Sequence, residues 1–281
     1  MTRLDRRALF TSGAAAALLA ASGLSLASRP QRGGRLRIAL AREEGSLDRV
    51  ARGAIFDTLT EVAPDGVLRG ELASGWQGSP DARTWDFTLR EGVRFHDGAT
   101  LTVADAADSL LAHPATAALI RRAEATGAGT LRLTLAEGNP HLPYLLSDSA
   151  LIVCRDGAVE GAMEHCNGTG LYAVRRMQDD RHFLGQRVAA HYRDGQAGWA
   201  DAVDAIVIPD PAVRAEALRD GYVDVAELPT PQGLSGRGEF VYHPSAEDVA
   251  IAARAGVGVP RVVGTRSTLD DGRIAERWWL A

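Results

Sequence analysis

The chain has 281 residues and a formal net charge of −5, with 46% hydrophobic and 24% charged residues. This is ordinary globular composition, and the length suits one large domain or two modest ones. The net negative charge argues against a nucleic-acid-binding protein, because such proteins usually carry a clustered basic surface. All 31 basic residues are arginine, which excludes a Schiff-base lysine and a Walker-type phosphate-binding lysine.

The first 27 residues are typical of an export signal. Basic residues that include Arg6 and Arg7 precede an apolar run, Ala14–Leu26, that is short for a bilayer span. Ser25-Leu26-Ala27 fits a small-residue cleavage site, and the arginine pair resembles a twin-arginine signal. We predict a periplasmic protein with no stable membrane insertion after cleavage. An uncleaved membrane anchor is the alternative.

Cys154 and Cys166 are the two cysteines of the chain. Because the periplasm favours disulfides, we predict that they pair. The alternative is a thiol metal site with Glu164 or His165, but the sequence lacks the second ligand cluster that zinc spacings usually contain. We predict neither a metal nor a cofactor.

Hydrophobic periodicity predicts most of the elements in chain order. Alternation predicts strands over 35–40, 85–89 and 131–135. Thr102 and Asp105 form a capping pair that predicts a helix ending near His113, before Pro114. A second short helix is predicted over 116–125.

A strand, a helix and another strand are predicted close together within residues 203–228. Apolar runs over 203–208 and 222–228 flank a helix that Asp210 caps and that begins at Pro211. This spacing is typical of a βαβ unit and therefore predicts two parallel strands in an α/β sheet. After Thr230 the chain is rich in glycine and proline, which predicts a linker.

A long series of motifs occurs in a fixed order along residues 35–228. The series is Ser46-Leu47-Asp48, Leu72-Ala73-Ser74-Gly75-Trp76, Phe87-Thr88-Leu89-Arg90, Phe95-His96-Asp97-Gly98, Leu101-Thr102-Val103-Ala104-Asp105, Asn167-Gly168-Thr169-Gly170-Leu171-Tyr172 and Asp220-Gly221-Tyr222-Val223-Asp224-Val225-Ala226. It resembles the extracytoplasmic solute-binding proteins of ABC importers, of the peptide and nickel type (family 5). Most of the aromatic and turn residues in these motifs suit the core and the turns of a fold.

The resemblance implies an α/β fold like the first lobe of a periplasmic binding protein. Residues 33–66 and 165–230 would form a discontinuous α/β domain, and residues 67–164 a smaller inserted α+β domain. Residues 231–281 would be a linker and C-terminal tail. The second lobe, which closes over the solute in this family, would be missing or vestigial.

The resemblance also implies a ligand-binding set. Ligand-facing backbone is expected near Arg49 and Val50. Gly168, Thr169 and Gly170 are expected to return the chain from the inserted domain beside a cleft, because glycine permits close backbone approach.

Two function hypotheses follow, and neither is an enzyme, because the sequence contains no nucleophile elbow, zinc-protease helix or dinucleotide-binding glycine motif. The first is a periplasmic receptor that delivers a peptide or related small solute to ABC transporter permease subunits. The second is a degenerate lobe that acts as a periplasmic scaffold. Trp278 and Trp279 would then mark a contact surface, unless they plug the base of the core.

Overall fold

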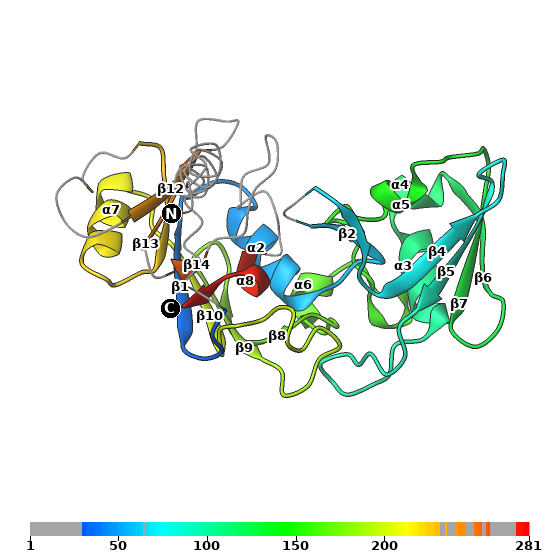
Figure 1. Ribbon diagram of the computed structural model, residues 1–281, viewed down its shortest axis with the longest axis horizontal. Helices are drawn as coiled ribbons and strands as arrows, with labels where there is room; N and C mark the ends of the chain where they lie inside the picture. The colour runs from blue at the N-terminus through cyan, green and yellow to red at the C-terminus, as the bar shows by residue number, and fades with distance from the viewer. Residues whose placement is uncertain are drawn as a thin grey trace, which may run out of the picture.

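The structure is a computed structural model that describes residues 30–63, 66–230, 234, 240–244, 250–254, 257–258 and 274–280. The predicted export signal, residues 1–27, lies outside this part of the chain. Figure 1 shows an elongated molecule with a larger sheet at one end and a smaller sheet at the other. From β1 onward the described chain begins in the larger sheet, passes to the smaller one and returns.

The larger sheet has seven strands. In spatial order they are β12 (Phe240–Pro244), β13 (Ala250–Arg254), β11 (Val225–Leu228), β1 (Arg35–Leu40), β10 (Ala202–Val207), β9 (His182–Arg187) and β8 (Tyr172–Gln178). The three central strands, β11, β1 and β10, run parallel, and the outer pairings are antiparallel. The predicted βαβ unit is therefore confirmed, and β1 lies between its two strands.

Two helices cover opposite faces of this sheet. Leu36, Ile38 and Leu40 of β1 belong to the same buried cluster as the apolar side of α2 (Ser46–Ile55). Ala39, which points to the other face, packs in a separate cluster with α7 (Pro211–Arg219). Because side chains alternate along a strand, α2 and α7 lie on opposite sides of the sheet.

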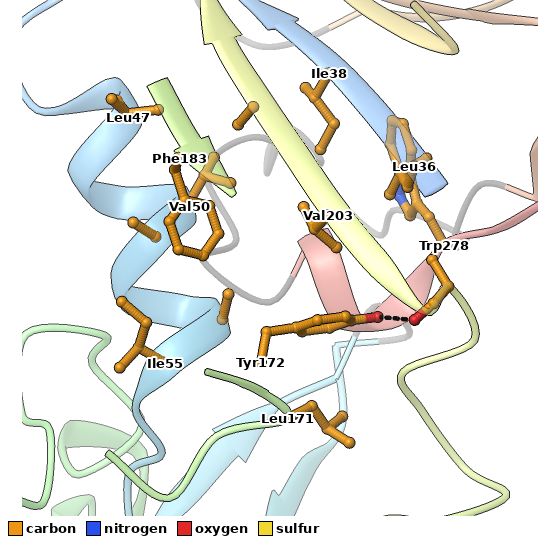
Figure 2. Packing of buried hydrophobic residues seen from close by; sticks show 14 of the residues in the cluster. Leu36, Ile38, Leu47, Val50, Ile55, Leu171, Tyr172, Phe183, Val203 and Trp278 are labelled. Atoms are coloured by element: carbon orange, nitrogen blue, oxygen red, sulfur yellow. Dashed lines mark hydrogen bonds between the residues drawn. The ribbon is translucent and has the colours of Figure 1, made fainter. Parts of the chain in front are cut away.

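The core under α2 includes the end of the chain. Figure 2 shows Tyr172 and Trp278 beside Leu36 and Val203, and the Tyr172 hydroxyl donates a 3.0 Å hydrogen bond to the carbonyl of Ala200. The Trp278 side chain is fully buried. It therefore fills the core rather than marking a contact surface.

The tail after residue 230 contains more than a linker. β13 pairs with β11, and β12 pairs with β13, so both extend the larger sheet. The prediction of a linker is wrong for these strands. The sequence signal was weak because β13 is built mainly from small apolar residues, Ala-Ile-Ala-Ala-Arg, without alternation.

The smaller sheet has four antiparallel strands. In spatial order they are β4 (Ala73–Gly78), β5 (Thr84–Leu89), β7 (Thr130–Leu135) and β6 (Ile120–Ala125). One face packs on α3 (Val103–Ala112), which begins with the predicted capping box between Thr102 and Asp105. The helix predicted over 116–125 is wrong. Its first residues lie in the short α4 (Pro114–Ala117), and the rest pair with β7 as a strand, so cross-strand pairing overrides the helix propensity of the alanines.

The remaining elements are short. They are the hairpin of β2 (Thr60–Val62) and β3 (Leu68–Gly70), α5 (Leu142–Leu145), the 3-10 turn η1 (Arg155–Gly157), α6 (Ala162–His165), and, near the end of the chain, β14 (Val257–Gly258), α8 (Ile274–Arg277) and β15 (Trp279–Leu280). Within the described ranges, no helix has both the length and the apolar character needed to cross a bilayer.

Candidate functional site

The carboxyl ends of β1 and β10 lie next to each other and lead to opposite faces of the sheet. β1 continues into α2 on one face, and β10 continues into α7 on the other. In open α/β sheets a crevice forms outside the carboxyl ends at such a switch point, and ligands bind there. We call residues 41–46, 208–210 and 227–230 the carboxyl edge.

Two buried charged residues hold the carboxyl edge together. Arg214 of α7 is 3% exposed and donates from Nη1 to the carbonyls of Ile208 and Pro209, and from Nε to the carbonyl of Glu227. The Glu227 carboxylate accepts a 2.7 Å hydrogen bond from the backbone amide of Ala41. The ends of β1, β10 and β11 are thus fixed relative to one another.

Charged groups of both signs lie around Glu227 at the carboxyl edge. Burial raises the pKa of Glu227, and the nearby Glu43 carboxylate raises it further, while the hydrogen bond from Ala41 and the positive charges of Arg214 and Arg49 oppose the rise. Glu43 and Arg49 themselves are exposed. The carboxyl edge therefore presents charged groups of both signs to solvent. The buried side chains of Arg214 and Glu227 fix the backbone beneath them.

The structure separates the residues expected to bind ligand. Arg49 is exposed in the first half of α2, close enough to Glu227 to lower its pKa. Val50 is 1% exposed and packs in the core, so its side chain does not reach the carboxyl edge. Gly168, Thr169 and Gly170 lie at the other end of α2 and are buried.

The glycine crossover packs tightly against the C-terminal end of α2. The amide of Gly170 donates a 2.8 Å hydrogen bond to the carbonyl of Ile55. A Cβ atom would lie 2.0 Å from that carbonyl oxygen if added to Gly168, and 2.5 Å from the Ala54 oxygen if added to Gly170. Only glycine permits this approach. The crossover is therefore a structural seam between the two sheets.

Two histidine side chains, one from each side of the crossover in the sequence, donate hydrogen bonds to its backbone carbonyls. His96 donates from Nε2 to the Gly170 carbonyl, and His191 donates from Nε2 to the Thr169 carbonyl, each at 2.8 Å. The Thr169 hydroxyl donates to the buried carboxylate of Asp57 at 2.9 Å. Burial lowers the pKa of His191 despite this carboxylate. The polar groups of the crossover thus bind the protein itself.

A buried ionic cluster extends the seam, and sequence reasoning missed it. Arg193 forms ion pairs with Glu61 at 2.8 Å, Glu71 at 3.0 Å and Glu276 at 3.2 Å, and Arg277 pairs with Glu61 at 2.9 Å. We call these five residues the seam cluster. Burial lowers the pKa of Arg193, but the three carboxylates outweigh this effect and hold it well above its ordinary value. No local motif could reveal the cluster, because the partners lie 83 to 132 residues from Arg193 in sequence.

The predicted disulfide is not present. Cys154 and Cys166 are both free thiols. Cys166 ends α6 and directs its thiol to the carbonyl of Met163, whereas the backbone of Cys154 is held by the Ser109 hydroxyl of α3. Burial raises the pKa of Cys154 to about 12. Across the described ranges, no three His, Cys, Asp or Glu side chains are grouped to hold a metal.

A comparison with known protein families matches the middle part of the chain. The family described as bacterial extracellular solute-binding proteins, family 5 Middle, matches residues 67–239, more than half of the chain. The chain belongs to family 5 of the bacterial extracellular solute-binding proteins. The binding-protein fold follows from this membership.

Two curated relatives resemble this family 5 chain in sequence. Protein XP55 of Streptomyces lividans is 31% identical over 265 residues, which cover 81% of this chain and 47% of that protein. The HTH-type transcriptional regulator SgrR of Salmonella typhimurium is 32% identical over 183 residues, which cover 61% of this chain and 31% of the regulator. The chain therefore spans less than half the length of either relative.

Solved structures show the same fold. The periplasmic binding protein DppA from Helicobacter pylori, in complex with the peptide STSA, has a TM-score of 0.66 and 21% identity, over 77% of this chain and 51% of DppA. The binding protein AgaA from A. tumefacien R10, in complex with agropinic acid, has a TM-score of 0.61 and 24% identity, over 69% of this chain and 44% of AgaA.

Proposed function

We propose that the carboxyl edge forms one wall of a solute site, and that the chain is a non-catalytic periplasmic receptor for a peptide or related small solute. In this proposal it delivers the solute to the permease subunits of an ABC importer. Export would use the signal in residues 1–27. Residues 33–66 with 165–230, and residues 67–164, would fold as two units that meet at the glycine crossover.

The observation that carries the proposal is the fixed base of the carboxyl edge. Arg214 and Glu227 hold three parallel strand ends at the switch point, beneath exposed Arg49 and Glu43. A peptide has a carboxylate at one end and an ammonium group at the other. Arg49 would bind the first and Glu43 the second, because charge-assisted hydrogen bonds are the strong ones. The complexes of DppA with a peptide and of AgaA with agropinic acid support this ligand class.

The scaffold alternative loses one of the observations that would suit it. Trp278 is fully buried and therefore offers no contact surface. The side chain of Trp279 lies outside the part of the chain whose side chains the structure describes.

A thermal-shift screen tests the proposal. The purified chain is tested against di- to tetrapeptides, nickel–histidine complexes and sugar acids, since a ligand of the folded state must raise the melting temperature. We expect a peptide to raise it, and calorimetry to show that Arg49→Ala weakens binding at least tenfold. Arg122→Ala, on the exposed face of β6, is the matched control and should bind normally. If no solute responds and one stoichiometric partner is recovered from the periplasm, the scaffold is the correct function.

A further inference from the structure

A pocket lies between α2, the end of α3 and the segment that carries α6. It has a volume of about 360 Å³. Arg52 of α2 and His113 at the C-terminal cap of α3 line one part of it, and Ile152, Val159 and Met163 line another. We call it the α6 pocket.

One donor atom of Arg52 has no partner in the α6 pocket. The Nε atom is buried and forms no hydrogen bond. Arginine stays charged at all ordinary pH values, and a buried donor without an acceptor is costly. A ligand with an acceptor group would remove this cost.

The surroundings of Arg52 favour an anion over a cation. His113, the other ionisable group at the inner wall, has its pKa lowered chiefly by burial and also by the positive charge of Arg52. Its Nε2 lies 3.4 Å from the carbonyl of Ile152, which only accepts, so this nitrogen carries the proton. Glu164, the carboxylate that lines the pocket, is exposed. Arg52 therefore supplies the pocket with a positively charged group whose Nε donor is buried.

The rest of the wall is apolar. Ile152 and Ala162 belong to the core under α2, and Val159 and Met163 pack against it. Pockets that bind small molecules combine such apolar walls with a few polar groups that fix orientation. An apolar chain of four or five carbons would lie against this wall while its carboxylate meets Arg52.

We propose that the α6 pocket binds a small organic monocarboxylate with a short apolar chain, held by Arg52. The site is separate from the carboxyl edge, and binding here does not depend on the proposed solute wall. A planar, forked guanidinium suits a carboxylate, which it can bind through two parallel hydrogen bonds.

Calorimetry with 4-methylpentanoate on the purified chain tests the proposal. We expect a Kd of about 1 mM or tighter, in keeping with the size of the ligand. The neutral 4-methyl-1-pentanol, which lacks the charge, and inorganic phosphate, which lacks the apolar chain, should each bind at least tenfold more weakly. Leucine, which adds an ammonium group, reports whether Glu164 contributes, and stronger binding than 4-methylpentanoate would overturn the choice of a simple monocarboxylate.

Two variants assign the binding to this pocket. Arg52→Leu should weaken 4-methylpentanoate at least tenfold, whereas Arg121→Leu, an exposed arginine of β6, removes the same charge elsewhere and should bind normally. Ala150→Trp places a large side chain at an exposed position of the pocket and should also abolish binding without disturbing the core. Absence of binding to the wild-type chain would overturn the proposal, and so would binding by Arg52→Leu or Ala150→Trp that is as strong as binding by the wild-type chain.

Discussion

The buried carboxylate of Glu227 accepts a 2.7 Å hydrogen bond from the backbone amide of Ala41, and so joins the ends of β11 and β1 across 186 residues of sequence. This contact places a titratable group, 5% exposed, at the base of the carboxyl edge. Its consequences for stability can be measured directly.

Glu227→Gln should change the pH dependence of stability. Burial raises the folded-state pKa of Glu227 above its ordinary value of 4.5. The unfolded chain therefore releases this proton first, so the contribution of Glu227 to stability is present at low pH and is lost as the pH rises from about 4.5 to the folded-state value. In urea unfolding, the stability of Glu227→Gln relative to wild type should increase over this range. A relative stability that falls as the pH rises would contradict the burial of this carboxylate.

Arg193→Leu should destabilise the fold strongly. It removes the cation that three buried carboxylates of the seam cluster share. Breaking a buried ion pair on one side costs about 3–5 kcal/mol, because the remaining charge is uncompensated. Arg122→Ala breaks the exposed pair with Glu124 and should cost less than about 1 kcal/mol. Equal effects of the two variants on the free energy of unfolding would mean that the seam cluster is solvated.

Gly170→Ala should be destabilising for a steric reason. The added Cβ would lie 2.5 Å from the Ala54 oxygen, which is a backbone atom and cannot rotate away. Overpacking of this kind costs about 1–3 kcal/mol. Gly75→Ala in β4, where the added Cβ meets no atom within 4 Å, is the matched control and should change stability by less than about 1 kcal/mol. The free energies of unfolding of the two variants, measured in urea, show whether the backbone packs closely at Gly170.

His191 should make the seam sensitive to acid. Burial lowers its folded-state pKa below the ordinary value of 6.5. Stability from the neutral ring is therefore fully present above about pH 6.5 and is lost as the pH falls through that value towards the folded-state pKa. His191→Gln should lose less free energy of unfolding than wild type between about pH 7 and about pH 5. An identical decrease in both proteins would show that His191 is not buried as a neutral ring.

The two cysteines should react as thiols. The pKa of Cys154 is raised to about 12 by burial, so it should resist a thiol reagent in the folded chain. Unfolding without reductant should release both Cys154 and Cys166 for reaction. If no thiol reacts after unfolding, the cysteines are joined by the disulfide that the sequence predicts.

The sequence predicts the elements whose signals are local. Alternation identifies β1 and β5, and the Thr102–Asp105 capping box identifies the start of α3. It fails at β6, where alanines favour a helix and only pairing with β7 makes a strand. β13 is missed for another reason, because it is built mainly from small apolar residues without alternation.

In the functional site, too, only the residues with a local sequence signal can be predicted. Arg49 could be named because it lies beside a motif shared with the family. The pairing of Arg214 with Glu227, and the seam cluster around Arg193, depend on contacts between distant segments and leave no pattern in the sequence. The sequence predicts a crossover at Gly168 and Gly170, but their close packing against Ile55 depends on the fold.

Amide hydrogen exchange on the solute-bound chain tests the carboxyl edge most directly. With the peptide found by thermal shift, we expect slower exchange at residues 41–46 and 208–210, and no change in residues 150–164. Protection confined to residues 150–164, or to the four-stranded sheet, would contradict a solute wall at the ends of β1 and β10.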